Sequence, residues 1–278
     1  MQKIIILTVL VAAVFTSCQN NDPISDPNSS NNLSTGQIEM KVYPDKNNNV
    51  SFYAMTQKMT VDWGDGTIND LTPNNGSGFI LPHHVYSNQN LQTVKVNTEN
   101  MTGDASVVVN SGGSTTASSY WGFQMNTGLQ AIKFGNCPEL KAIECGGNQL
   151  TALDVSKCTA LNSLYCDTTQ LTSLDISKCK DLIILECVKN QLTSLDISKC
   201  TSLKYLNCND NKLTSLDVSK CASLIIVYCY GNQLSATALN NLFNSLPTNE
   251  HGMIFCSDNS GYATCDETIA TKKGWKVF

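Results

Sequence analysis

The stretch Leu171–Cys200, LTSLDISKCKDLIILECVKNQLTSLDISKC, begins and ends with the same segment, LTSLDISKC, 21 positions apart. Close variants of this unit recur from Leu150 to Leu234, and two columns of cysteine keep the same spacing without a break. A period of this length indicates a solenoid, because one unit is too small to bury its apolar face and must share a core with its neighbours. The two columns are Cys137, Cys158, Cys179, Cys200, Cys221 and Cys145, Cys166, Cys187, Cys208, Cys229.

The second half of each unit carries the more specific pattern. It reads LNSLYCDTTQL from Leu161, LIILECVKNQL from Leu182 and LKYLNCNDNKL from Leu203. These segments resemble the bacterial leucine-rich repeat, LxxLxLxxNxL, of internalin-like and BspA-like surface proteins, with cysteine replacing the leucine of the central strand. The resemblance implies asparagine amides that bond the backbone of adjacent turns. Thr169 departs from the pattern and predicts one weaker rung, whereas the matching positions are Asn148, Asn190, Asn211 and Asn232.

The repeat ends after Leu234, where a helical cap is expected. Ser235 is a good helix N-cap, and apolar residues then recur at helical spacing until Pro247. A strand at Met253–Cys256 and the final Trp275–Phe278 are expected to close the core. Such a cap is required because an open solenoid end would expose apolar surface.

The segment from Gln37 to about Asn110 alternates apolar and polar residues at the strand period, which predicts a small β-sandwich. Two motifs within it, VDWGDGT at Val61–Thr67 and HVY at His84–Tyr86, resemble the PKD-type immunoglobulin-like modules of extracellular proteins. The resemblance implies an immunoglobulin-like unit that acts as a stalk.

The amino terminus, MQKIIILTVLVAAVFTSC, has one lysine, an apolar run and small residues before Cys18. This pattern predicts a secretion signal that is too short for a stable membrane span. The residues before Cys18 resemble the bacterial lipobox, which implies lipidation of Cys18 and a surface-exposed anchor in the outer membrane. Ordinary signal cleavage, with Cys18 incidental, is the alternative. The stretch that follows is rich in Asn, Ser, Asp and Pro and predicts a flexible tether.

The expected fold class is mainly β: an immunoglobulin-like (PKD-like) β-sandwich, then a leucine-rich-repeat solenoid with 21-residue coils and a C-terminal cap that contains a short helix. The expected divisions are a signal peptide at 1–17, a tether at 18–36, the sandwich at 37–110, a connector at 111–128 and the solenoid at 129–278, with its cap from about 235.

Thirteen cysteines in an exported protein would usually suggest disulfides. Strands stacked in register hold equivalent side chains parallel and about 4.8 Å apart, whereas a disulfide requires Cβ atoms that converge to about 3.8 Å. The two columns are therefore expected to be reduced thiols that pack in the core. A disulfide that involves Cys256 or Cys265 is one alternative. A metal site is another, although a ladder spreads its sulfurs along a line.

Composition and motifs disfavour catalysis and nucleic-acid binding. The 18 basic and 23 acidic residues give no extended basic face for phosphates, and no nucleic-acid partner is expected. The chain has three histidines and lacks GxxxxGK[ST], HExxH and GxSxG motifs. Glu144 and Glu186 share a column, but two coils separate them by about 10 Å. We therefore expect no enzyme, no catalytic residue, no metal and no cofactor.

Two further columns, one of aspartate and one of serine, are nearly constant among the repeats. These side chains are expected to satisfy backbone donors in tight turns, and a calcium site built from the aspartates is the alternative. The columns are Asp154, Asp175, Asp196, Asp217 and Ser156, Ser177, Ser198, Ser219.

The strand positions that point away from the core vary from coil to coil and form the candidate binding face. Tyrosine there would suit a protein partner or a sugar ring, since it pairs an apolar face with a polar tip. A strand preference for Tyr, Ile and Val explains the same composition without any ligand. Adhesion to a protein is the first expectation, glycan capture the alternative, and a purely architectural envelope role the third. The candidate residues are Tyr165, Ile184, Glu186, Val188, Tyr205, Asn207, Ile226, Tyr228 and Tyr230.

Overall fold

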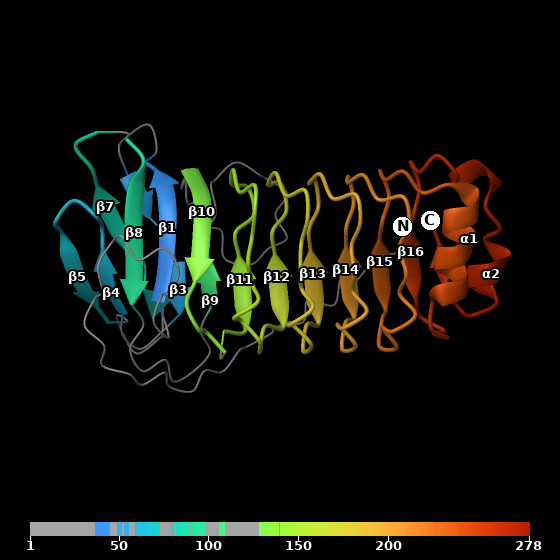
Figure 1. Cartoon of the computed structure of the whole chain (residues 1–278). Coiled ribbons are helices and arrows are strands. Elements are labelled where there is room, and N and C mark those ends of the chain that lie inside the picture. The colour runs from blue at the N-terminus through green and yellow to red at the C-terminus, as the bar shows by residue number, and fades with distance from the viewer. Residues whose placement is uncertain are drawn as a thin grey trace, which may run out of the picture.

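The structure, a computed structural model, shows an elongated chain (Figure 1). Antiparallel sheets form one end, a stack of short parallel strands the middle, and helices the other end. The expected signal peptide, the tether with Cys18, and residues 111–127 of the connector lie outside the described residues. The described residues are 37–44, 49–51, 53–55, 59–72, 79–80, 82–88, 90–97, 106–108, 128–138 and 140–278.

The N-terminal end contains a five-stranded antiparallel sheet with the order β10-β1-β8-β4-β5. The alternation seen in the sequence is reproduced there, because Met40, Val61 and Val94 are fully buried. The strands are β1 (Gln37–Tyr43), β4 (Met59–Asp62), β5 (Ile68–Leu71), β8 (Gln92–Asn97) and β10 (Gly128–Phe134).

A second sheet joins the N-terminal end to the solenoid. Strand β9 pairs in parallel with β11, the first strand of the repeats, and β3 and β6 continue the same sheet in antiparallel pairing. Strand β10, which the sequence assigns to the solenoid, pairs with β1. Backbone hydrogen bonds thus join the N-terminal end directly to the solenoid. The strands are β3 (Tyr53–Met55), β6 (Phe79–Ile80) and β9 (Ser106–Val108), with β2 (Asn49–Ser51) and β7 (His83–Val85) as a separate pair.

The repeats form the parallel strands that the period predicts. Equivalent positions pair directly from coil to coil; for example, Leu164 pairs with Leu185 and Leu185 with Leu206. The middle residue of each strand is buried. This in-register stacking confirms a solenoid of the leucine-rich-repeat type. The strands are β11 (Ala142–Glu144), β12 (Ser163–Tyr165), β13 (Ile184–Glu186), β14 (Tyr205–Asn207), β15 (Ile226–Tyr228) and β16 (Met253–Phe255).

Both cysteine columns face the interior, as expected, and all ten thiols are buried. Several of them also donate weak hydrogen bonds to backbone carbonyls. The Cys166 thiol lies 3.5 Å from the Glu186 carbonyl oxygen, and the Cys221 thiol lies 3.6 Å from that of Cys200. A thiol therefore fills the core like a small apolar group and can also donate to a carbonyl oxygen of an adjacent coil.

The asparagine ladder ties successive coils together. The Asn190 amide donates to the carbonyls of Cys166 in the preceding coil (2.8 Å) and Cys187 in its own (3.2 Å), and its oxygen accepts from the Leu171 amide (3.0 Å). Asn211 and Asn232 repeat this arrangement. Each side chain thus satisfies backbone groups of two coils inside the core.

Thr169 replaces asparagine in the second coil and bonds differently. Its hydroxyl donates to the Cys166 carbonyl at 3.0 Å and lies 2.5 Å from the Asn190 side-chain oxygen. A hydroxyl has one proton to donate, whereas an amide has two. This loss of a donor is a physical reason to expect weaker bonding between coils at Thr169. The weaker bonding remains a prediction.

A sixth coil lies within the region assigned to the cap. Asn259 accepts a hydrogen bond from Leu234 and donates to the carbonyls of Cys229 and Cys256, as the ladder asparagines do. Cys256 is fully buried. The Cys-x-x-Asn spacing was present in the sequence, but the helix inserted before it breaks the 21-residue period.

The expected turn role of the aspartate column is confirmed. The amide of Ser177 donates to Asp175 at 2.9 Å, and the other three coils show the same bond. Hydrogen bonds from Ser177 and Ser198 lower the pKa of Asp175 and Asp196. These carboxylates are therefore occupied in closing turns.

Helices close the far end, together with strand β17 (Lys276–Val277). Helix α1 (Ala236–Ser245) begins at Ser235, whose side chain accepts from the Ala238 amide as the sequence predicts. It is followed by the short helices η2 (Tyr262–Thr264) and α2 (Thr268–Thr271). Among the described residues, no helix has the length and hydropathy needed to cross a membrane.

The residue before each ladder position adopts a left-handed conformation. Gly147 and Gly231 have φ values of 69° and 64°, but Thr168, Lys189 and Asp210 each have 53°. This conformation is costly for residues with a Cβ atom, and especially for a β-branched one. The fold therefore imposes strain at Thr168.

Replacing Thr168 with Gly should raise the free energy of unfolding by about 1 kcal/mol, because glycine adopts this conformation without steric cost. Urea denaturation of the chain from Gln37 to Phe278 measures the effect. Asp210→Gly is the matched control and should gain less, since aspartate tolerates the left-handed region. Destabilisation by Thr168→Gly would contradict the assignment of strain.

The described thiols should differ sharply in reactivity. Burial raises the pKa of Cys179 to about 11 and that of Cys200 to about 12, so the native ladder lacks reactive thiolate near neutral pH. Cys265 is partly exposed, although burial and then Glu267 raise its pKa as well. In the chain from Gln37, iodoacetamide should label Cys265 first, and all twelve thiols only after unfolding.

Mass spectrometry of the labelled peptides identifies the sites. Cys265→Ser should abolish the early labelling and leave the slow labelling unchanged. Early modification of a ladder cysteine, or fewer than twelve free thiols after unfolding, would contradict a reduced and closed core.

Candidate functional site

The outward side chains of β11–β16 and of the residues just after these strands form one continuous surface, called here the sheet face. Inward residues such as Leu185 and Leu206 are fully buried, whereas their neighbours along the strand are half-buried. All nine candidate residues lie on this face, in three columns. From β11 to β15 the columns are Ala142, Ser163, Ile184, Tyr205, Ile226; Glu144, Tyr165, Glu186, Asn207, Tyr228; and Gly146, Asp167, Val188, Asn209, Tyr230.

The sheet face is not uniformly open. Ser163 and Asn209, although outward, are each only 2% exposed. The Asn209 side-chain oxygen accepts a hydrogen bond from the Tyr230 amide at 3.0 Å, so Asn209 supports the chain of the next coil. These two residues are therefore part of the supporting structure more than of the contact surface.

Acidic groups gather at the β11–β13 part of the sheet face. On the central one of these three strands, Tyr165 pairs with Glu144 of β11 on one side and with Glu186 of β13 on the other. Asp167 lies against Gly146, where an added Cβ atom would come within 2.9 Å of its carboxylate. The absence of a side chain at Gly146 thus allows Asp167 to fold back over the neighbouring coil.

Burial and mutual repulsion perturb these groups. The pKa of Glu186 is raised to about 7, first by burial and then by the charges of Asp167 and Glu144. Burial also raises the pKa of Asp167. The pKa of Tyr165 is raised to about 12 by burial and then by Glu186 and Glu144. The Tyr165 side chain is therefore neutral near pH 7, on the strand between those of Glu144 and Glu186.

Aromatic rings occupy the β14–β17 part of the sheet face. Tyr228 and Phe255 stack with ring centroids 4.5 Å apart and planes 10° apart, and Phe255 and Phe278 stack at 4.6 Å and 12°. Tyr205 meets Tyr228 at 5.7 Å with the planes tilted by 51°. We call these four rings the aromatic stripe. Sequence reasoning missed Phe255 and Phe278 because they follow the last regular repeat.

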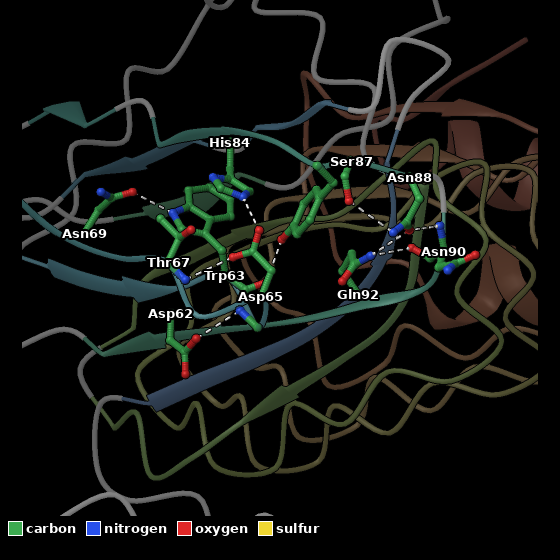
Figure 2. A network of polar contacts seen from close by, with 12 residues as sticks. Asp62, Trp63, Asp65, Thr67, Asn69, His84, Ser87, Asn88, Asn90 and Gln92 are labelled. Carbon is green, nitrogen blue, oxygen red and sulfur yellow. Dashed lines mark hydrogen bonds and ion pairs between the residues drawn. The ribbon is translucent and has the colours of Figure 1, made fainter.

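The two motifs of the N-terminal unit meet in one network (Figure 2). The His84 ring stacks on Trp63 with centroids 5.1 Å apart and contacts the Asp65 carboxylate at 2.7 Å. The Tyr86 hydroxyl donates to the Trp63 carbonyl at 2.7 Å, and the Trp63 indole N–H donates to Asn69 at 2.7 Å. Separate segments of the chain are thus held together around a fully buried Trp63.

This network is structural in character. Partial burial alone would raise the pKa of Asp65, but hydrogen bonds from His84 and Thr67 hold it below its usual value. The His84 ring stacks on Trp63 and meets Tyr86 edge to face. His83, the neighbouring residue in β7, is exposed, and His251 is exposed in the C-terminal cap. Neighbouring side chains of a strand point to opposite faces, so His83 is directed away from His84. The described residues thus bring no second histidine to His84 as a catalytic partner.

Two features lie away from the sheet face and the N-terminal network. A shallow hollow of about 640 Å³ lies between Thr214–Ser219 and α1, and most of the residues that line it are serine, threonine or asparagine. It does not include the candidate residues. Within the described part of the chain, no group of three or more His, Cys, Asp or Glu side chains converges on a possible metal position.

No protein-family model and no curated protein matches the chain. The solved structures that it resembles are bacterial leucine-rich-repeat proteins. The functional domain of InlJ from Listeria monocytogenes, which includes a cysteine ladder, is 29% identical over 50% of this chain and 31% of its own, with a TM-score of 0.40. The internalin InlF from the same organism is 19% identical over 51% and 48%, with a TM-score of 0.38.

A leucine-rich-repeat protein from Leptospira interrogans is 19% identical over 50% of this chain and 43% of its own, with a TM-score of 0.40. This chain therefore spans less than half the length of each of these three structures.

The raised pKa of Glu186 predicts a pH-dependent stability. Between the ordinary pKa of 4.5 and the folded value of about 7, the folded chain binds the proton more tightly than the unfolded chain. This contribution to stability is present below pH 4.5 and is lost as the pH rises through 7, by as much as about 3 kcal/mol. Glu186→Gln removes the titrating carboxyl group and with it this loss of stability. The free energy of unfolding of the variant should therefore increase relative to that of the wild type as the pH rises.

Urea denaturation at a series of pH values measures this difference. Glu250→Gln, at an exposed position in the cap, is the matched control and should follow the wild type. A stability difference between Glu186→Gln and the wild type that does not change with pH would show that the carboxyl group titrates normally.

Proposed function

We propose that this chain is a non-enzymatic cell-envelope protein that binds a protein partner through the sheet face, in adhesion or host interaction. In this proposal, residues 1–17 direct export and Cys18 carries the lipid that anchors the chain at the outer-membrane surface. Residues 18–36 form the tether, and a PKD-like unit within 37–110 acts as a stalk that presents the solenoid.

The observation that carries the proposal is the aromatic stripe on an otherwise regular surface. The buried leucines, thiols and asparagines supply the core and the ladder of hydrogen bonds that hold successive coils together. The stripe nevertheless leaves Phe278 47% exposed and Tyr205, Tyr228 and Phe255 half-buried. Large aromatic side chains on an open surface are typical anchors of protein interfaces.

Ring geometry favours a protein over a glycan. A sugar ring packs on the face of an aromatic ring, yet the faces of Tyr228 and Phe255 are covered by neighbouring rings of the stripe. The ring edges and the tyrosine hydroxyls remain, and these suit the irregular mixture of apolar and polar groups on a protein surface. Glycan capture therefore stands second.

The test begins with a screen of the chain from Gln37 to Phe278 against arrays of purified extracellular proteins and of glycans. Replacing Tyr165, Tyr205 and Tyr228 together with Ala should weaken the protein interaction by about tenfold or more. Replacing the same three with Phe keeps the rings and should retain most of the affinity. Surface plasmon resonance measures both.

Two controls separate binding from folding. Loss of stacking should cost about 1 kcal/mol per ring pair, so each variant is first checked for its unfolding transition. Ala at Thr172, Thr193 and Thr214, an exposed column away from the sheet face, should leave affinity unchanged. Undiminished binding by the Tyr→Ala variant, or hits only on the glycan array, would refute the protein-binding proposal.

A further inference from the structure

Two carboxyl groups of the sheet face, those of Asp167 and Glu186, have no balancing cation among the described residues. Among the described residues, neither Asp167 nor Glu186 forms an ion pair with a lysine. In the part of the chain that the structure describes, the charges that act on Glu186 are those of Asp167 and Glu144, which are both carboxylates. The solenoid therefore keeps Asp167 and Glu186 close together on a half-buried surface, although burial and like charge disfavour their ionised forms.

Such a cluster restricts what can cover it. A neutral or acidic partner would remove the remaining water from Glu186 and Asp167 without replacing its hydrogen bonds, which is costly for charged groups. A guanidinium or ammonium group supplies both the opposite charge and the donors. The surface thus complements a cation.

The aromatic stripe begins close to the acidic cluster. Glu186, Asn207, Tyr228 and Phe255 stand in one column on successive strands. Strands in a sheet lie about 4.8 Å apart, which places Tyr228 about 10 Å from Glu186 along the long axis. An extended chain spans that distance in about three residues. One short segment of a partner could therefore meet both features.

We propose that the sheet face binds a protein segment in which arginine or lysine side chains lie over Asp167 and Glu186 and an apolar side chain, about three residues away, packs on the aromatic stripe. The inference rests on the proposed protein-binding function and names its partner class. Arginine suits the site best, because its fork can engage two carboxylates and its plane can pack beside Tyr165.

The test uses a display library of short random peptides selected on the chain from Gln37 to Phe278, with counter-selection on the Tyr205→Ala/Tyr228→Ala variant. Recovered peptides should be basic and should carry an aromatic or aliphatic residue near the basic one. Fluorescence anisotropy with the synthetic peptides then gives dissociation constants. Combining Glu186→Gln with Asp167→Asn should weaken binding by about tenfold, and raised salt should weaken it further.

The matched control removes the same charge elsewhere. Glu250→Gln combined with Glu267→Gln neutralises two exposed carboxyl groups in the cap and should leave the affinity unchanged. Equal weakening by both pairs would show only a general attraction to a negative protein and would overturn the inference. Urea denaturation confirms that the variants are folded, and loss of the buried charge on Glu186 is expected to stabilise the chain.

The remaining outcomes separate this inference from the proposed function. One outcome is that the recovered peptides require the tyrosines, are neutral or acidic, and bind the carboxyl variants equally well. This outcome would overturn the proposal of a cationic partner and would leave the proposal of protein binding intact. If no peptide requires the sheet face and the Tyr→Ala variant also keeps its protein partners from the array, both proposals are wrong.

Discussion

The stacking of every coil on the next in the same register is the constraint on which this molecule depends. Buried asparagines enforce it, because each amide must satisfy backbone groups of two coils at once, as Asn190 does with Cys166 and Cys187. A shift of one residue would leave those groups unpaired in the core and would turn the strand side chains to the opposite side. The left-handed residue before each ladder position is the local cost of this arrangement, and in the coil where Thr169 replaces asparagine that residue is the β-branched Thr168.

The same constraint determines the character of the sheet face. Register brings equivalent positions together at one strand spacing, whatever their chemistry. Where the column holds Tyr228 and Phe255, the rings stack and stabilise the coil. Where it holds Glu144 and Glu186, burial and then the charges of Asp167 and Glu144 raise the pKa of Glu186 to about 7. One half of the sheet face therefore carries carboxyl groups that repel one another, and the other half carries stacked aromatic rings. The proposed choice of partner follows from this difference.

The repeat period was sufficient to predict the strands, the buried thiols and the aspartate turns, because identical coils repeat identical contacts. The period did not predict features that lie outside the regular repeat. Asn259 and Phe255 belong to a coil lengthened by α1, so neither was assigned its role. The pairing of β9 with β11 joins segments of unlike sequence and depends on tertiary packing, to which no period applies. Asp167 reaches the acidic cluster from another column, because Gly146 leaves room for it.

The direction of the inter-coil hydrogen bonds has a mechanical consequence. They run along the long axis of the solenoid, since the strands lie across it (Figure 1). Tension applied between the two ends therefore loads the coil interfaces in series, and the weakest interface opens while the others remain closed. Each coil that comes away releases 21 residues, or about 70 Å of extended chain. Under such tension the solenoid is therefore expected to lengthen in steps, one coil at a time.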